Sequence, residues 1–156
     1  PDFALALLRE AKKRHIHTTI ETCGHYPTDV LDQACRVLDA LIFDIKCLDS
    51  ARHKKATGVG SELILKNIGH VFEHFPELPV LIRTPVIPGF NDTEEDILGI
   101  REMIPRKANI RYEALTYHRM GQPKYGYLGR RYELEGVKAD EAFMKRLNIM
   151  LKSYEK

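Results

Sequence analysis

The feature that most constrains the fold is a strict alternation of short apolar segments with amphipathic helical segments. Apolar segments rich in strand-forming residues lie at 17–21, 40–46, 79–86 and 109–115. Apolar residues at helical spacing predict helices at 3–11, 27–38, 61–75 and 138–154, and another that begins after Thr93. This alternation predicts an α/β fold with a parallel sheet and right-handed crossovers. The continuous apolar runs at 41–43 and 80–82 predict strands that are buried on both faces.

Local signals place the helix starts and the loops. Asp2, Ser61 and Thr93 are expected to be the N-caps of their helices. The segment 49–60 is polar, and the glycine-rich segment 116–132 is predicted to be a loop.

The chain opens directly on its first helix. Phe3, Leu7, Leu8 and Ala11 recur at helical spacing, so this face is expected to cover a sheet. No initiator methionine and no strand precede the helix. We therefore expect residues 1–156 to be the C-terminal portion of one domain whose earlier strands are missing from this sequence. The uncovered edge of strand 17–21 should then favour self-association.

Composition excludes some partners. The chain has a formal charge of +2, with 44% hydrophobic and 29% charged residues, so nothing argues for nucleic acid or a membrane surface. No run of about eighteen apolar residues predicts a membrane span. Cys23, Cys35 and Cys47 lie twelve residues apart, too far for a metal-binding knuckle. We interpret them as reduced thiols of a cytoplasmic protein, and we expect no metal site in this chain.

Charged residues gather where the strands end, which is where parallel α/β folds place their active sites. Asp44 and Lys46 lie two residues apart, so on a strand they point to the same face. Arg83 lies inside an apolar strand, where a charge is costly unless it meets water, a ligand or another charge. Two interpretations remain open. These residues contact a ligand, or they form a structural ion network in which Arg83 pairs with Glu21 or Asp44.

His118 is a weaker candidate that gains weight from its position. It follows the fourth strand, beside Tyr117 and Gly121. Glycines after the strands permit tight turns and close approach of the backbone to a ligand. No phosphate-binding loop, GxGxxG pattern or Ser-His-Asp signature is present, so the sequence does not predict ATP, a dinucleotide or a serine hydrolase.

Three blocks of residues together resemble one known family. They are Asp44-Ile45-Lys46, the run R-T-P-V-I-P-G-F-N-D at 83–92, and the run from Tyr117 to Tyr132 that contains Y-H-R-M-G and K-Y-G-Y-L-G-R-R-Y. In this order they are similar to the C-terminal part of the glycyl-radical-enzyme activating enzymes of the pyruvate formate-lyase activating enzyme type. These enzymes belong to the radical S-adenosylmethionine superfamily. The resemblance covers essentially the whole chain.

The resemblance implies a partial, open, TIM-like (β/α)₆ barrel, of which this chain supplies the last four β/α units. The family's C-x-x-x-C-x-x-C loop, which holds a [4Fe-4S] cluster, and its G-G-E-P motif are not in this sequence. We therefore expect the cluster only in a full-length parent and expect the fragment itself to be inactive. Whether the parent also carries a ferredoxin-like insertion stays open.

For the parent, the resemblance implies a radical mechanism. An electron donor such as flavodoxin or ferredoxin supplies the cluster with one electron. Bound S-adenosylmethionine is then cleaved to methionine and a 5′-deoxyadenosyl radical. This radical abstracts a Cα hydrogen from one glycine of a partner glycyl-radical enzyme, pyruvate formate-lyase or a relative. The protein supplies position, shielding and electrostatics.

The resemblance also assigns roles to individual residues. Those that match cosubstrate-binding positions are Asp44, Ile45 through its backbone, Lys46, His118 and Glu21. Glu21 stands where the family has an aspartate and reaches one methylene further. Arg83 matches a barrel arginine near the cosubstrate or the peptide substrate, and it is the one possible catalytic residue in the chain.

Two other functions stay open. A radical S-adenosylmethionine enzyme that acts on a small molecule could share these residues, but the block from Lys124 to Tyr132 argues against it. A non-catalytic barrel fragment that serves as an interaction domain would explain the missing cluster loop. A C-x-x-x-C-x-x-C loop upstream in the reading frame would distinguish these possibilities.

Overall fold

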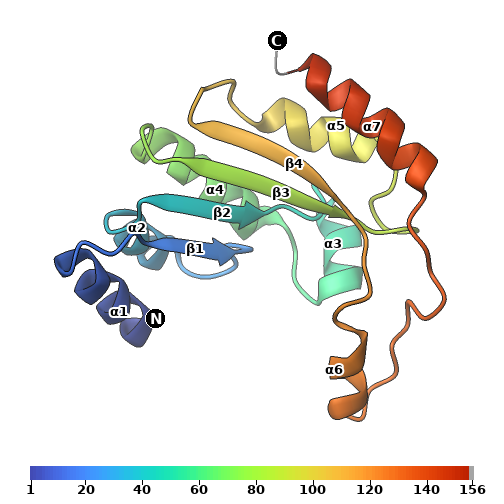
Figure 1. Cartoon of the computed structure of the whole chain (residues 1–156), viewed down its shortest axis with the longest axis horizontal. Coiled ribbons are helices and arrows are strands. Elements are labelled where there is room, and N and C mark those ends of the chain that lie inside the picture. The colour runs from blue at the N-terminus through green and yellow to red at the C-terminus, as the bar shows by residue number, and fades with distance from the viewer. Residues whose placement is uncertain (155–156) are drawn as a thin grey trace.

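A computed structural model describes residues 1–154 and shows a four-stranded parallel sheet (Figure 1). The strands lie side by side in sequence order, and every neighbouring pair is parallel. They are β1 (Thr19–Thr22), β2 (Ala40–Asp44), β3 (Val80–Val86) and β4 (Ile110–Thr116). The prediction of an α/β fold with four parallel strands is confirmed.

Five helices confirm the predicted alternation: α1 (Asp2–Lys13), α2 (Thr28–Cys35), α4 (Glu62–His74), α5 (Glu94–Met103) and α7 (Glu141–Ser153). Two further helices were not predicted: α3 (Ser50–Thr57) lies in the polar segment 49–60, and α6 (Gln122–Tyr127) lies in the segment predicted to be a loop. The loop prediction was therefore wrong at α6. None of the helices within residues 1–154 combines the length and the apolar sequence that a membrane span requires.

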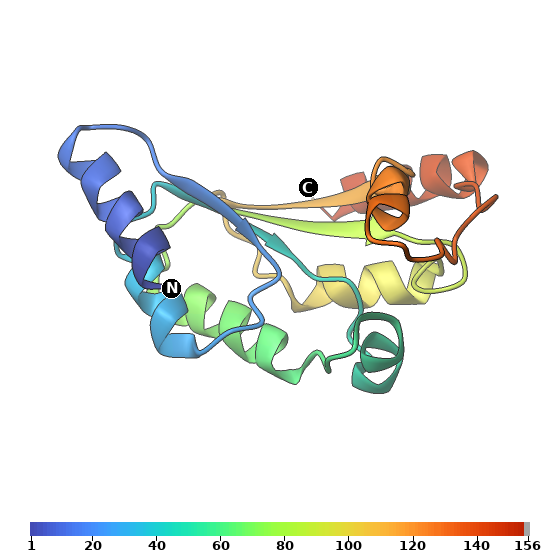
Figure 2. The ribbon, with the colours of Figure 1, turned by 90° about the horizontal axis from the view of Figure 1, so that it is seen from below.

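One face of the sheet is covered by helices, and the other is not. Helices α2, α4 and α5 lie along the same face, as the side view in Figure 2 shows, and α7 packs against β4 and α5. Burial alternates along β2 and β3 accordingly: Leu41, Phe43 and Ile82 are fully buried, whereas Ile42 and Leu81 are only partly buried. The expectation that these strands are buried on both faces was therefore wrong for the described residues. The covered face holds the main apolar core.

The three predicted N-caps had different outcomes. Thr93 caps α5, since its hydroxyl accepts a hydrogen bond from the Asp96 backbone at 3.1 Å. Asp2 is already the first residue of α1 and makes no capping bond. Ser61 precedes α4, but it is buried and its hydroxyl donates to the Leu48 carbonyl at 2.8 Å instead of capping. A competing local acceptor therefore overrides the capping preference.

Helix α1 only partly behaves as expected. Leu5 is buried against the core and Leu8 packs beside it, but Phe3 is 81% exposed and Leu7 is 58% exposed. The expectation that Phe3 and Leu7 cover the sheet was wrong here, because no described strand lies on the outer side of β1. A cavity of about 360 Å³ opens there, lined by Leu5, Leu8, Ile20, Tyr26, Val30 and Ala34 among others. Self-association through this edge stays a prediction.

Near the amino-terminal end of β1, Asp39 joins α1 to the sheet. Its carboxylate accepts hydrogen bonds from Lys12, from the Thr18 backbone at 2.8 Å and from the Thr18 hydroxyl at 3.1 Å. The Lys12 ammonium and then the Thr18 backbone lower the pKa of Asp39 to about 2. The ionised carboxylate is thus favoured in the folded state.

This lowered pKa gives a pH-dependent prediction. A group whose folded pKa lies below its unfolded value of about 3.9 stabilises the fold above that pH and loses the effect as pH falls toward the folded pKa. Asp39→Asn should therefore lower the urea midpoint at pH 6, and the difference from the unsubstituted chain should shrink between about pH 4 and pH 2. Glu77→Gln, at an exposed side chain with no hydrogen bond recorded within residues 1–154, is the matched control. A difference that stays constant down to pH 2 would contradict this account.

Candidate functional site

The uncovered face of the sheet carries charged side chains in adjacent strands. The strand register places Glu21 beside Ile42 and Asp44 beside Arg83, and Arg83 in turn beside Glu113. Because alternate residues of a strand share a face, Glu21, Asp44 and Arg83 all lie opposite the helices. Glu21 and Asp44 lie at the carboxyl ends of their strands, where the sequence predicted the site, and Arg83 lies in the middle of β3.

Arg83 is the centre of this group. Its guanidinium donates to Asp44 Oδ1 from both Nε and Nη2 at 3.3 Å and also donates to Glu21. Its side chain is 19% exposed and that of Asp44 is 17% exposed. Burial alone lowers the pKa of Arg83, but the bonds to Glu21 and Asp44 outweigh it and raise that pKa. Arg83 is therefore a permanent cation that fixes two carboxylates. Arg83 thus pairs with both Glu21 and Asp44, and its contact with a ligand stays a prediction.

Lys46 completes a cluster of four residues with Glu21, Asp44 and Arg83, called the charged cluster below. Its ammonium lies 3.4 Å from Asp44 Oδ2, and its side chain is 29% exposed. This bond is long, and an ammonium group has three donors. No other partner for Lys46 Nζ is recorded among residues 1–154. Lys46 is thus the member of the charged cluster with most capacity to bind a ligand.

Ile45 lies between Asp44 and Lys46 and holds this part of the backbone in place. Its side chain is fully buried in the core, its amide donates to the Arg83 carbonyl at 3.0 Å, and its carbonyl accepts from the Thr84 hydroxyl at 2.8 Å. Asp44 and Lys46 consequently both point away from the core. The predicted role of the Ile45 backbone toward a ligand remains a proposal.

The turn after β1 forms the rim beside Glu21. Gly24 is buried with a φ of +68°, a conformation that favours glycine, and its amide donates to the Thr22 hydroxyl at 2.9 Å. Cys23 is an exposed free thiol at this rim. The tight turn packs against the ring of Phe43, on the core side of the sheet.

His118 stands apart from the charged cluster. It is exposed, and its Nδ1 accepts only a 3.4 Å bond from the Met120 amide. It begins the segment that carries α6, which Figure 1 shows extending away from the sheet. Tyr117, just before His118, and Tyr132 share a hydroxyl–hydroxyl bond, which raises the pKa of Tyr132. No contact between His118 and the charged cluster is recorded for residues 1–154.

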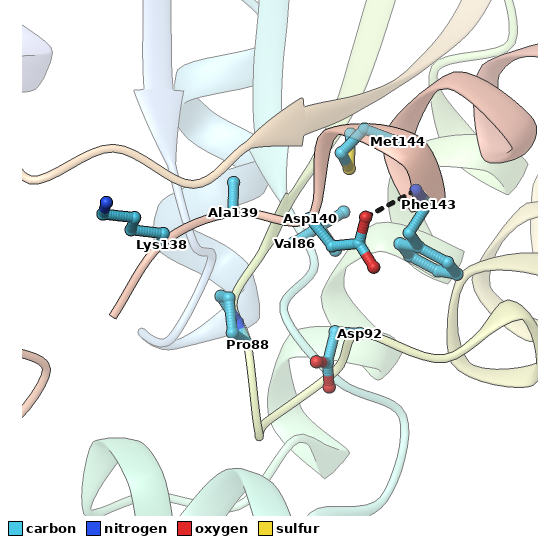
Figure 3. A pocket seen from close by; sticks show the side chains of 8 residues that line it. All are labelled: Val86, Pro88, Asp92, Lys138, Ala139, Asp140, Phe143 and Met144. Carbon is cyan, nitrogen blue, oxygen red and sulfur yellow. Dashed lines mark hydrogen bonds between the residues drawn. The ribbon is translucent and has the colours of Figure 1, made fainter. Parts of the chain in front are cut away.

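A small cavity lies on a different part of the molecule, between the turn after β3 and the start of α7 (Figure 3). Its volume is about 110 Å³, which is below the several hundred Å³ typical of small-molecule sites. Asp140 at its edge accepts a bond from the Phe143 amide at 2.9 Å and so caps α7. None of the predicted site residues lines this cavity, and we interpret it as a packing gap.

The described residues offer nothing that fits a metal or an iron–sulfur cluster. Residues 1–154 contain no group of three or more His, Cys, Asp or Glu side chains placed to hold a metal ion. The three thiols are free, and two of them, Cys35 and Cys47, are buried. Burial raises the pKa of Cys35 to about 12, which disfavours the thiolate that a metal requires.

Comparison with known proteins gives close relatives, although no protein-family model matches the chain. Over 156 residues it is 99% identical to the (2S)-3-sulfopropanediol sulfolyase activating enzyme of Bilophila wadsworthia, and the match covers 100% of this chain and 52% of that protein. It is 46% identical over 151 residues to the isethionate sulfite-lyase activating enzyme of Nitratidesulfovibrio vulgaris, covering 97% of this chain and 49% of the relative.

A solved structure agrees with these relatives. A domain of pyruvate-formate lyase-activating enzyme from Bacteroides vulgatus matches 99% of this chain and 86% of the solved chain, with a TM-score of 0.75 and 25% identity. The chain itself spans about half the length of the curated relatives that it matches.

Proposed function

Because the chain belongs to the family of glycyl-radical-enzyme activating enzymes, we propose that it forms the part of such an activase that holds S-adenosylmethionine. The observation that carries this proposal is the charged cluster on the uncovered face of the sheet. In this proposal residues 1–156 are the C-terminal portion of a radical S-adenosylmethionine domain. Their four strands are the last four units of a partial (β/α)₆ barrel.

The cosubstrate fits the charges that the face presents. S-adenosylmethionine carries a carboxylate, an ammonium group, a sulfonium centre and two ribose hydroxyls. Lys46 can donate to the carboxylate or to a hydroxyl, and Asp44 can accept from the ammonium group or from a hydroxyl. Arg83 already bonds both carboxylates of the charged cluster, so its role is to orient Asp44 and Glu21. His118 is proposed to reach the nucleoside from the segment after β4.

Position and charge are what these residues would contribute to the reaction. The bound cosubstrate supplies hydrogen-atom abstraction, with an electron from a [4Fe-4S] cluster whose ligands the described residues do not include. The charged cluster would hold the cosubstrate on a face that no described helix covers. A partner's glycine-bearing loop could approach it there, and a flavodoxin or ferredoxin would supply the electron.

The relatives favour one class of partner. The two similar proteins named above are activating enzymes of a sulfolyase and of a sulfite-lyase. We therefore propose that the partner is a glycyl-radical lyase that acts on a sulfonate, more specifically a sulfopropanediol sulfolyase. This choice rests on the 99% identity over the whole of the present chain.

The test is radical formation in the partner. The whole protein, with its cluster reconstituted, is incubated without oxygen with S-adenosylmethionine, a reductant and purified sulfolyase. Electron spin resonance should show a glycyl radical in the sulfolyase, and none when the sulfolyase's radical glycine is replaced by alanine. A radical formed in pyruvate formate-lyase but not in the sulfolyase would refute the partner choice. No radical in either enzyme would refute the activase proposal.

A further inference from the structure

A proline interrupts the sheet next to the charged cluster. Pro85 lies in β3, which is paired on both sides, and proline is unusual in such a strand because it has no amide hydrogen. Ile45 makes one of its two expected ladder hydrogen bonds with β3, since its amide donates to the Arg83 carbonyl at 3.0 Å. In a parallel ladder the Ile45 carbonyl would accept from the amide of residue 85. Proline cannot donate there, and β2 ends at Asp44.

Two buried side chains donate to the backbone carbonyls of residues 45 and 46. The Thr84 hydroxyl donates to the Ile45 carbonyl at 2.8 Å, and Asn91 Nδ2 donates to the Lys46 carbonyl at 2.7 Å. Both side chains are fully buried. Asn91 also donates to the Pro85 carbonyl at 2.9 Å and accepts from the Ile87 amide at 2.7 Å. The backbone of residues 45–46 is thus held by side chains of the β3 end and its turn.

We propose that Thr84 and Asn91 are positioning residues that hold Lys46 for the cosubstrate. The inference rests on the proposed function, because it assumes that Lys46 binds S-adenosylmethionine. Burial alternates over residues 44–46, with Ile45 in the core and Asp44 and Lys46 on the uncovered face. Without the two side-chain bonds, buried carbonyls would lose their partners and this stretch would relax. A binding group works best when its support is fixed before the ligand arrives.

The first experiment removes one hydroxyl from the full-length protein. Thr84→Val keeps the shape of the side chain but loses the donor to Ile45, whereas Thr84→Ser keeps a hydroxyl. S-adenosylmethionine affinity is measured by calorimetry well below the melting temperature. We expect Thr84→Val to weaken binding about three- to tenfold, the size of one lost hydrogen bond, and Thr84→Ser to restore most of it.

The second variant addresses Asn91. Asn91→Asp keeps the acceptor for Ile87 but turns a charged oxygen toward the Lys46 and Pro85 carbonyls, and it should weaken binding by about tenfold or more. Asn109→Asp is the matched control. Asn109 also donates to two carbonyls, those of Pro76 and Leu78 at 2.9 and 2.8 Å, but it lies at the opposite end of the strands. Asn109→Asp should leave the affinity unchanged.

A double-mutant cycle separates positioning from general stability. If Thr84 acts through Lys46, Thr84→Val should change the affinity of a Lys46→Met protein by less than about twofold. Full multiplication of the two effects, or unchanged affinity in both Thr84→Val and Asn91→Asp, would overturn the positioning role while Lys46→Met still weakens binding. Unchanged affinity in Lys46→Met alone would instead refute the proposed site itself.

Discussion

Replacing Gly24 with alanine should destabilise the chain by roughly 2–5 kcal/mol, the combined size of left-handed strain and overpacking. Gly24 has a φ of +68°, which alanine adopts only at a cost. A Cβ built there would lie 2.2 Å from Phe43 Cζ. Phe43 is fully buried near the carboxyl end of β2, so its ring has little room to move. Urea unfolding followed by circular dichroism measures the effect.

Gly58→Ala is the matched control for this experiment. Gly58 ends α3 with a φ of +89°, but a Cβ there meets nothing within 4 Å. This variant should therefore cost only the backbone term, about 1–2 kcal/mol. Equal losses at the two positions would mean that Phe43 yields to the added methyl group and that the turn after β1 is less tightly packed than described.

Replacing Lys46 with methionine in the whole protein should weaken S-adenosylmethionine binding about ten- to a hundredfold. A charge-assisted hydrogen bond contributes about 1.5–3 kcal/mol, which corresponds to this range. Methionine retains most of the length and the apolar stem of lysine, so the fold should be preserved. Calorimetric titration gives the affinity, and a melting curve checks the fold.

Lys66→Met provides the comparison, because Lys66 lies exposed on α4, on the helix side of the sheet. It changes the same charge without touching the charged cluster and should leave the affinity unchanged. If Lys46→Met binds as tightly as the unsubstituted protein while its melting curve is normal, Lys46 does not belong to the site.

The strands and the long helices were predictable because their apolar residues are numerous and regularly spaced. The predicted strand at 79–86 corresponds to β3 (Val80–Val86), and the helix at 61–75 corresponds to α4 (Glu62–His74). The shift from 17–21 to β1 (Thr19–Thr22) reflects His17, which lies outside the ladder. These strands and helices form because one side of each is buried against the core, and the spacing of apolar residues in the sequence indicates that burial.

The two short helices could not be predicted from the same signal. Helix α3 buries only His53, and its sequence S-A-R-H-K-K-A-T is almost entirely polar. It is held by its ends, since Asp49 accepts from the Arg52 amide at 2.9 Å and Gly58 takes the left-handed conformation. Helix α6 buries no residue at all. Short helices that bury few residues leave little periodic pattern in the sequence.

For the site, the strand-end argument found Glu21, Asp44, Lys46 and Arg83, and the sheet register brings these four together. The sequence could not show that Arg83 bonds both carboxylates, because partner choice depends on that register. Thr84 and Asn91 were not singled out, since buried polar residues near a turn look like ordinary turn residues. Pro85 within a central strand was the available signal, because it requires substitute donors nearby.

The most direct measurement of the central claim is a crystal structure of the whole protein with S-adenosylmethionine bound. The account predicts that the cosubstrate lies on the uncovered face of the sheet, with the Lys46 ammonium in hydrogen-bonding distance of its carboxylate or ribose hydroxyls. Asp44 should remain bonded to Arg83 in that complex. A cosubstrate bound without any contact to residues 44–46 would contradict the account.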